Sequence, residues 1–165
     1  MSWSDLLNKP PAVHVSPYGT TSVNIKEPIF YNIDCQILVN PVTLGDTLHI
    51  ISVTLLDISN SYYFISRAAK ASLFINLTFD LYENTRRVIM EKCSRLAGNR
   101  KLSYSDVQSI YINELKQLKD TIKRFHDETH NGTYPPGLQK WTNYLHDKTG
   151  TDHSALLQRA LSEKP

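Results

Sequence analysis

Two histidines stand four residues apart in the segment His126-Asp127-Glu128-Thr129-His130. Side chains four apart lie on one face of a helix, so this pair has the spacing of a zinc chelate. The catalytic order His-Glu-x-x-His is absent because Asp127 follows the first histidine, and no third ligand stands out. We therefore interpret the segment as a solvated polar helix end, and we expect no metal and no cofactor.

The two cysteines, Cys35 and Cys93, are the other candidates for chemistry, since a thiol paired with a histidine can be a nucleophile. Cys35 falls on the apolar face of a predicted strand, where a thiol usually packs inertly. Cys93 lies between Lys92 and Arg95, which favour the thiolate. The sequence has no glycine-rich phosphate loop and no G-x-S-x-G motif. We therefore expect both cysteines to be structural and the protein not to be an enzyme.

A basic stretch is the clearest candidate for binding. The chain has a net charge of only +2, yet residues 86–101 hold six basic side chains against Glu91 alone. Such a stretch indicates an anionic contact surface, although a solvated helix face is the ordinary alternative. Tyr82 and Tyr104 lie at its edges rather than among the cations, which favours phosphate or lipid headgroups over base recognition. The predicted contact residues are Arg86, Arg87, Lys92, Arg95, Arg100 and Lys101.

Two segments alternate between apolar and polar residues and predict β-strands. They are residues 29–40 and residues 73–82. Between them, Leu48, Ile51 and Leu55 recur at helical spacing, and Thr43 followed by Asp46 resembles a capping box. We predict a helix there, although its many β-branched residues favour a strand. The side chains expected in the core are Ile33, Ile37, Leu73, Ile75, Leu77 and Phe79.

The C-terminal half reads as helical. Residues 85–97 fit either a helix or a strand, and that choice stays open. Ser103 and Ser105 are plausible caps for an amphipathic helix over 104–130, which Asn131-Gly132 ends. Shorter helices are expected around 138–146 and 154–162. The predicted fold is α+β: a single domain with an antiparallel sheet packed against helices and a helical C-terminal half.

The first 22 residues predict an extended N-terminal arm, followed by one domain over residues 23–165. Prolines interrupt the arm, while an apolar group at its start needs a surface to cover it. Burying tryptophan or leucine on a neighbouring subunit would support self-association. No signal peptide and no transmembrane segment is expected. The residues predicted to self-associate are Trp3, Leu6, Leu7, Pro10 and Pro11.

The middle of the chain has a layout that resembles a known family. An aromatic-rich alternating strand (IFYNIDCQILVN) leads through a proline into the segment PVTLGDTLHIISVTLLDISNSYYF. The basic turn SRAAKAS, with Arg67 and Lys70, then leads into LFINLTFDLY. This pattern, over about residues 28–82, resembles the core of rhabdovirus matrix proteins, and the chain length is similar to the short forms of the plant-infecting branch. The family's N-terminal arm is basic, whereas this one has only Lys9 before Lys26.

The resemblance implies a non-enzymatic viral structural protein that self-associates, binds anionic membrane and condenses the nucleocapsid. The partners implied are the protein itself, anionic lipid headgroups and viral nucleoprotein–RNA, with direct RNA contact as a further expectation. The location implied is the inner face of the virion envelope and the host cytoplasm. The alternative function is an RNA-binding viral accessory or coat protein.

Tyr134-Pro135-Pro136-Gly137-Leu138 has the look of the tyrosine-proline-leucine motifs with which viral structural proteins recruit budding machinery. A proline-stiffened loop between helices is the simpler interpretation, and the sequence leaves the role of this segment open.

Overall fold

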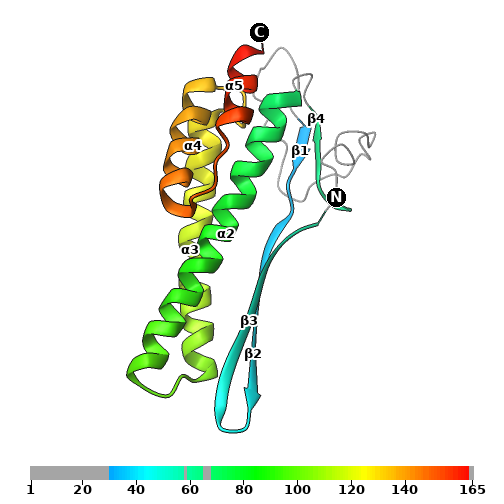
Figure 1. The fold of residues 1–165 in the computed structure, drawn as a ribbon. Helices are drawn as coiled ribbons and strands as arrows, with labels where there is room; N and C mark the ends of the chain where they lie inside the picture. The colour runs from blue at the N-terminus through cyan, green and yellow to red at the C-terminus, as the bar shows by residue number, and fades with distance from the viewer. Residues whose placement is uncertain (1–29, 58, 65–67, 164–165) are drawn as a thin grey trace.

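The structure is a computed structural model that describes residues 30–57, 59–64 and 68–163. A strand-rich segment comes first and a helical segment follows, which confirms the α+β class, the antiparallel pairing and the helical C-terminal half. Figure 1 shows a long hairpin lying along the lower part of a helical body. The elements are β1 (Phe30–Asn32), β2 (Cys35–Leu44), β3 (Thr47–Leu56), β4 (Tyr62–Phe64), α2 (Ala68–Asn99), α3 (Tyr104–Thr129), α4 (Pro135–Thr149) and α5 (Ser154–Ser162).

The hairpin is formed by β2 and β3, which pair antiparallel over ten residues each, and β1 and β4 pair beyond its open end. The strand predicted at 29–40 is confirmed as extended chain, but it is broken at Ile33-Asp34 into β1 and β2, which belong to separate sheets, and residue 29 lies outside the described residues. The prediction of a helix between residues 40 and 73 is wrong, because residues 47–56 form the strand β3. β-Branched residues dominate this segment, and Gly45 (φ +59°) with Asp46 supplies a two-residue hairpin turn.

The strand predicted at 73–82 is also wrong, because these residues belong to the 32-residue helix α2. Helix α2 packs against α3, α4, α5 and the hairpin, so apolar residues surround its N-terminal half. A helix that is buried on several sides carries no single apolar stripe, and its residues can alternate by chance. The open choice at 85–97 is resolved as helix.

Helix α3 begins where its capping residues predict. Ser103 is the N-cap of α3, and it forms a reciprocal capping box with Asp106. Helix α3 ends at a left-handed His130, one residue before Asn131-Gly132. Helices α4 and α5 contain the two shorter helices that the sequence predicts.

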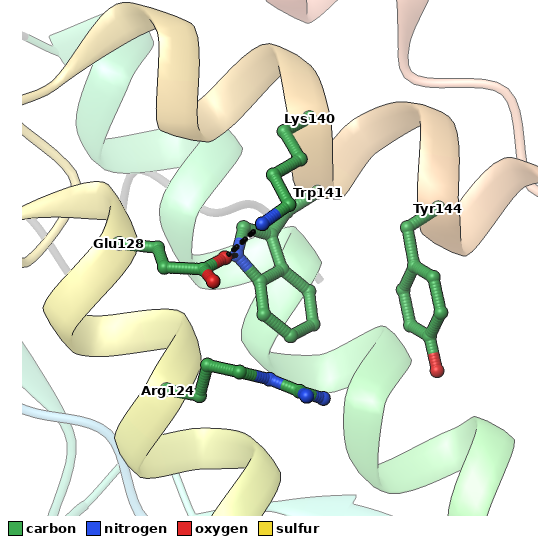
Figure 2. A pocket seen from close by; sticks show the side chains of 5 residues that line it. All are labelled: Arg124, Glu128, Lys140, Trp141 and Tyr144. Atoms are coloured by element: carbon green, nitrogen blue, oxygen red, sulfur yellow. Dashed lines mark hydrogen bonds and ion pairs between the residues drawn. The ribbon is translucent and has the colours of Figure 1, made fainter.

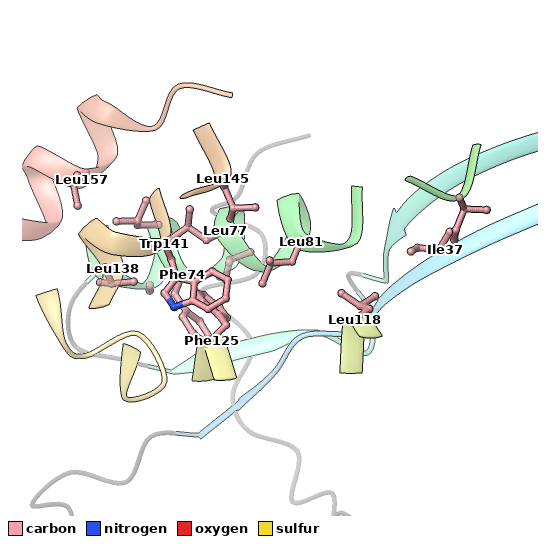
Figure 3. Close-up of a cluster of buried hydrophobic side chains, with 14 of the residues drawn as sticks. Ile37, Phe74, Leu77, Leu81, Leu118, Phe125, Leu138, Trp141, Leu145 and Leu157 are labelled. Carbon is pink, nitrogen blue, oxygen red and sulfur yellow. The ribbon is translucent and has the colours of Figure 1, made fainter. Parts of the chain in front are cut away.

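The hydrophobic core lies where α2, α3, α4 and α5 converge, and it continues toward the hairpin through Ile37 and Leu118 (Figure 3). Phe74 of α2 stacks on Phe125 of α3, with ring centroids 4.9 Å apart. Of the predicted core residues, four are confirmed as buried: Ile37, Leu73, Ile75 and Leu77. The other two, Ile33 and Phe79, are half-buried.

Polar contacts of Glu163 and His153 connect the C-terminal part of the described chain to α2. The Glu163 carboxylate accepts hydrogen bonds from the backbone N–H groups of Ala69 (2.7 Å) and Lys70 (3.2 Å) at the start of α2. An acceptor at this position satisfies donors that lack a partner within the helix. A buried pair, Asp80 Oδ2 and His153 Nε2 at 2.7 Å, joins α2 to the start of α5.

Candidate functional site

The hairpin presents two faces with different surroundings. Its inner face, with Cys35 and Ile37 buried, lies against α2 and α3. We call the opposite side the outer face. Successive side chains of a strand point to opposite sides of the sheet, so the outer face takes alternate residues of each strand. It consists of Gln36, Leu38, Asn40, Val42 and Leu44 from β2, and Thr47, His49, Ile51, Val53 and Leu55 from β3.

Polar contacts dock the inner side of the hairpin on the helices. The Tyr111 hydroxyl of α3 donates to the Ile37 carbonyl oxygen at 2.9 Å. From α2, Arg86 Nη1 donates to Ser52 Oγ at 2.8 Å. Thr54 Oγ1 donates to Glu83 Oε2 at 2.9 Å. These three bonds, spread over both strands, hold the hairpin in one position on the helical body.

Glu83 is the electrostatic centre of this docking. Its carboxylate accepts from Arg86 Nε and Nη2, from Arg87 Nε and from Thr54 Oγ1, all within 2.9 Å. Hydrogen bonds from Arg86 foremost, and then from Arg87 and Thr54, lower the pKa of Glu83 from 4.5 to about 2 against the opposing effect of burial. The carboxylate is therefore fully charged at neutral pH.

The outer face is mostly aliphatic: six of its ten side chains are leucine, isoleucine or valine, and the other four are Gln36, Asn40, Thr47 and His49. Its exposed aliphatic side chains include Ile51 at 63% and Leu44 at 61% of full exposure. Leu38, Val53 and Leu55 are each 43–47% exposed. None of its ten residues is an aspartate, glutamate, lysine or arginine, and no lysine or arginine occurs between Lys26 and Arg67. Large exposed apolar groups gathered on one side of a sheet mark an interaction surface.

The predicted basic residues lie on the second half of α2 and on the connection to α3. Five of the six form intramolecular ion pairs. Arg86 and Arg87 share Glu83, Lys92 contacts Glu114 at 2.5 Å, Arg95 contacts Glu91, and Arg100 contacts Asp106 at 2.6 Å. Among the residues that the structure describes, Lys101 has no ion pair.

These pairs reduce the excess of positive charge that the sequence indicates. Within residues 86–101 only Glu91 opposes six cations, whereas the fold adds Glu83, Glu114 and Asp106. Six cations then face four carboxylates, which leaves a local charge of +2. Arg95 and Arg100 nevertheless keep side-chain exposures of 75% and 53%, so an external anion can reach them.

A pocket between α3 and α4 is lined by Arg124, Glu128, Lys140, Trp141 and Tyr144 (Figure 2). Glu128 Oε2 accepts from Lys140 Nζ and from Trp141 Nε1, both at 2.8 Å. The Arg124 guanidinium lies 5.5 Å from the Trp141 ring centroid, which is a cation–π contact. The polar groups therefore contact one another across the pocket and join α4 to α3.

The histidines and cysteines considered for chemistry pack against aromatic rings or are buried. His126 packs against Phe74, and burial lowers its pKa, while His130 stacks on Tyr134. Both cysteines are buried, and burial together with Asp34 raises the pKa of Cys35 to about 12. In the described part of the chain, no group of three histidine, cysteine, aspartate or glutamate side chains is placed to hold a metal ion.

The segment Tyr134–Leu138 is the start of α4. Tyr134 is the N-cap, and the two prolines occupy the first helical positions, which suit them because no backbone N–H is needed there. Leu138 is fully buried. A β-carbon on Gly137 would lie 2.1 Å from the Glu128 carbonyl oxygen, so the two helices touch at this glycine. Because Leu138 is buried, the segment Tyr134–Leu138 does not present its leucine to a partner as a linear motif would.

The arm residues Trp3, Leu6, Leu7, Pro10 and Pro11 lie outside the described residues, and their predicted role in self-association stays a prediction. The outer face is the feature that the sequence analysis missed, because residues 47–56 were expected to be helical. The two-residue Gly45-Asp46 turn between apolar, β-branched runs is the signal that could have revealed it.

None of the helices in the described ranges has both the length and the apolar composition that crossing a bilayer requires. Comparison of the chain with protein-family models, with curated protein sequences and with solved structures finds no match.

Proposed function

We propose that this chain is a non-enzymatic structural protein of the viral matrix type, which self-associates and binds anionic membrane and the nucleocapsid. The observation that supports it best is the outer face of the hairpin, which is mostly aliphatic, has no aspartate, glutamate, lysine or arginine, and is open to solvent. In the described residues β2 and β3 form a two-stranded sheet, so both are edge strands, and natural proteins usually protect edge strands with lysine or other charges. A hairpin without that protection is suited to association.

The exposed cations support adhesion to an anionic surface. Arg95 lies near the end of α2, and Arg100 and Lys101 lie in the connection to α3. The hairpin turn lies at the same end of the molecule in Figure 1, and Thr43 Oγ1 is 3.4 Å from the Tyr104 hydroxyl there. One end of the protein therefore carries exposed cationic side chains beside the hairpin turn. Near an anionic membrane, each cation contributes on the order of 1 kcal/mol, less at high salt.

Pelleting with lipid vesicles tests this function. The full chain is mixed with phosphatidylserine-containing vesicles and, as a control, with pure phosphatidylcholine vesicles at low and at moderate salt. We expect pelleting with the anionic vesicles only, decreasing as salt rises. Failure to pellet, together with RNA binding that falls steeply with salt, would replace the matrix proposal with the RNA-binding alternative.

A further inference from the structure

We propose that the outer face of the hairpin packs face to face against the outer face of a second copy, as a two-fold symmetric dimer. This inference rests on the self-association proposed above, and it names the surface and the partner. The hairpin, formed by β2 and β3, lies at the side of the molecule in Figure 1. Its inner face is occupied by α2 and α3, so the outer face is the one that can receive a partner.

The pairing register distributes apolar side chains over the whole length of the outer face. Its five cross-strand pairs are Gln36–Leu55, Leu38–Val53, Asn40–Ile51, Val42–His49 and Leu44–Thr47. Each of these pairs contains at least one aliphatic side chain. A second sheet packed on this face would therefore meet apolar groups along the full length of both strands, as inner faces of two-sheet proteins do.

The charge of the face selects the kind of partner. Phosphate groups and lipid headgroups need cations, and the outer face has no lysine or arginine. A strongly charged protein surface would lose solvation on this face without gaining an ion pair. A second copy presents the same mostly aliphatic face, which has no aspartate, glutamate, lysine or arginine to leave unpaired. A self-complementary patch of this kind is what a two-fold interface requires.

The hairpin is also held ready for binding. Hydrogen bonds with Tyr111, Arg86 and Glu83 hold its inner side on the helices. The outer face is therefore already formed before a partner binds. A preformed surface loses less conformational freedom on binding.

The size of the face predicts a weak, reversible dimer. Ten-residue strands extend over roughly 34 Å, and two of them span about 10 Å across the sheet. A flat face of that size covers about 340 Å² per partner, less than half of the roughly 800 Å² per partner of a standard-size complex, so the face supports only a transient dimer. We expect dimerisation to depend on concentration.

A matched pair of isoleucines tests the inference. Ile51, on the outer face, is 63% exposed, and Ile112, on α3, is 56% exposed. Ile51→Lys would place an ammonium in the apolar interface, so we expect it to raise the dimer dissociation constant at least about tenfold. Ile112→Lys adds the same charge outside the interface, and we expect less than about a twofold change. Circular dichroism checks that both variants fold.

Cross-linking gives a second, independent readout. A cysteine introduced as Asn40→Cys, in the central cross-strand pair of the outer face, lies near the two-fold axis and should join two copies through a bis-maleimide of about 10 Å, the spacing of two packed sheets. Ile112→Cys is the control and should give few cross-linked pairs. The native Cys35 and Cys93 are buried, which leaves the introduced thiol as the accessible one among the described residues.

The alternative occupant of the outer face is the chain's own arm, and Leu6→Lys tests it. The inference is supported if Ile51→Lys weakens the dimer and Asn40→Cys cross-links two copies. It is overturned if Ile51→Lys leaves dimerisation unchanged, or if Asn40→Cys gives no more cross-linked pairs than Ile112→Cys; in the second case, a dimer that Leu6→Lys weakens would identify the arm as the occupant. Vesicle pelleting that persists in Ile51→Lys would leave the proposed function standing, whereas a wild-type chain that neither pellets nor dimerises would contradict both.

Discussion

Replacing Glu83 with glutamine tests how much the charge of Glu83, which pairs with Arg86 and Arg87 on α2 and accepts from Thr54 of the hairpin, stabilises the fold. The folded protein lowers the pKa of Glu83 from 4.5 to about 2, chiefly through Arg86. A carboxyl whose folded pKa lies below its unfolded pKa contributes stability that is fully present above the unfolded value. That stability is lost as pH falls through the folded value. The contribution of Glu83 is therefore present at neutral pH and disappears between about pH 4.5 and about pH 2.

The magnitude follows from the same lowering of the pKa. One pKa unit corresponds to about 1.4 kcal/mol, so a lowering from 4.5 to about 2 sets an upper bound of about 3 kcal/mol. The side chain keeps 19% of its exposure, and Arg87 is half-exposed, so water screens the interaction. We therefore expect Glu83→Gln to lower the free energy of unfolding by about 1–2 kcal/mol at pH 7.

Urea unfolding followed by circular dichroism measures this loss at about pH 7 and again at about pH 3. The matched control is Glu91→Gln, because Glu91 forms an exposed pair with Arg95 one turn apart on the same helix. Such pairs contribute about 0.5 kcal/mol or less. The reasoning fails if Glu83→Gln costs no more than Glu91→Gln, or if its cost does not shrink in acid.

Three further substitutions have defined outcomes. Leu77→Ala, in the fully buried part of α2, should lower the free energy of unfolding by about 2–5 kcal/mol in urea; a loss below about 0.5 kcal/mol would contradict its packing. Gly137→Ala forces a β-carbon to within 2.1 Å of the α3 backbone and should cost at least about 1–3 kcal/mol by thermal unfolding; an unchanged midpoint would contradict that contact. Reversing Arg95, Arg100 and Lys101 together to glutamate should abolish pelleting with anionic vesicles at moderate salt; unchanged pelleting would show that these cations are not the contact.

Local signals in the sequence predicted the elements that depend on local chemistry. Ser103 and Asp106 mark the start of α3 because they form its capping box, and Asn131-Gly132 follows its left-handed C-cap, His130. The alternation over 29–40 predicted β2 because one face of that strand is buried and the other is exposed.

The secondary structure predicted for two segments was wrong, and each error has a physical reason. Residues 73–82 lie at the centre of the helical body, where burial on several sides removes the helical stripe from the sequence. Residues 47–56 carry apolar side chains on both faces of β3. Some of these side chains, Leu48, Ile51 and Leu55, therefore have the three- and four-residue spacing of a helix face, although the segment is a strand. In both segments the pattern depends on the packing partners, which single-sequence periodicity does not contain.

The basic stretch shows the same limit for the candidate site. Counting charges over 86–101 finds Glu91 as the only opposing acid, whereas Glu114 and Asp106 come from α3 and Glu83 from one turn before. Ion pairs between elements are set by the tertiary fold, so the surface charge could not be read from the segment alone.

Sedimentation equilibrium of the full-length chain over a range of concentrations tests the central claim, self-association, most directly. The account predicts that the mean mass rises with concentration from the monomer's 18.9 kDa toward at least twice that value. A mean mass that stays at 18.9 kDa at every concentration would contradict it.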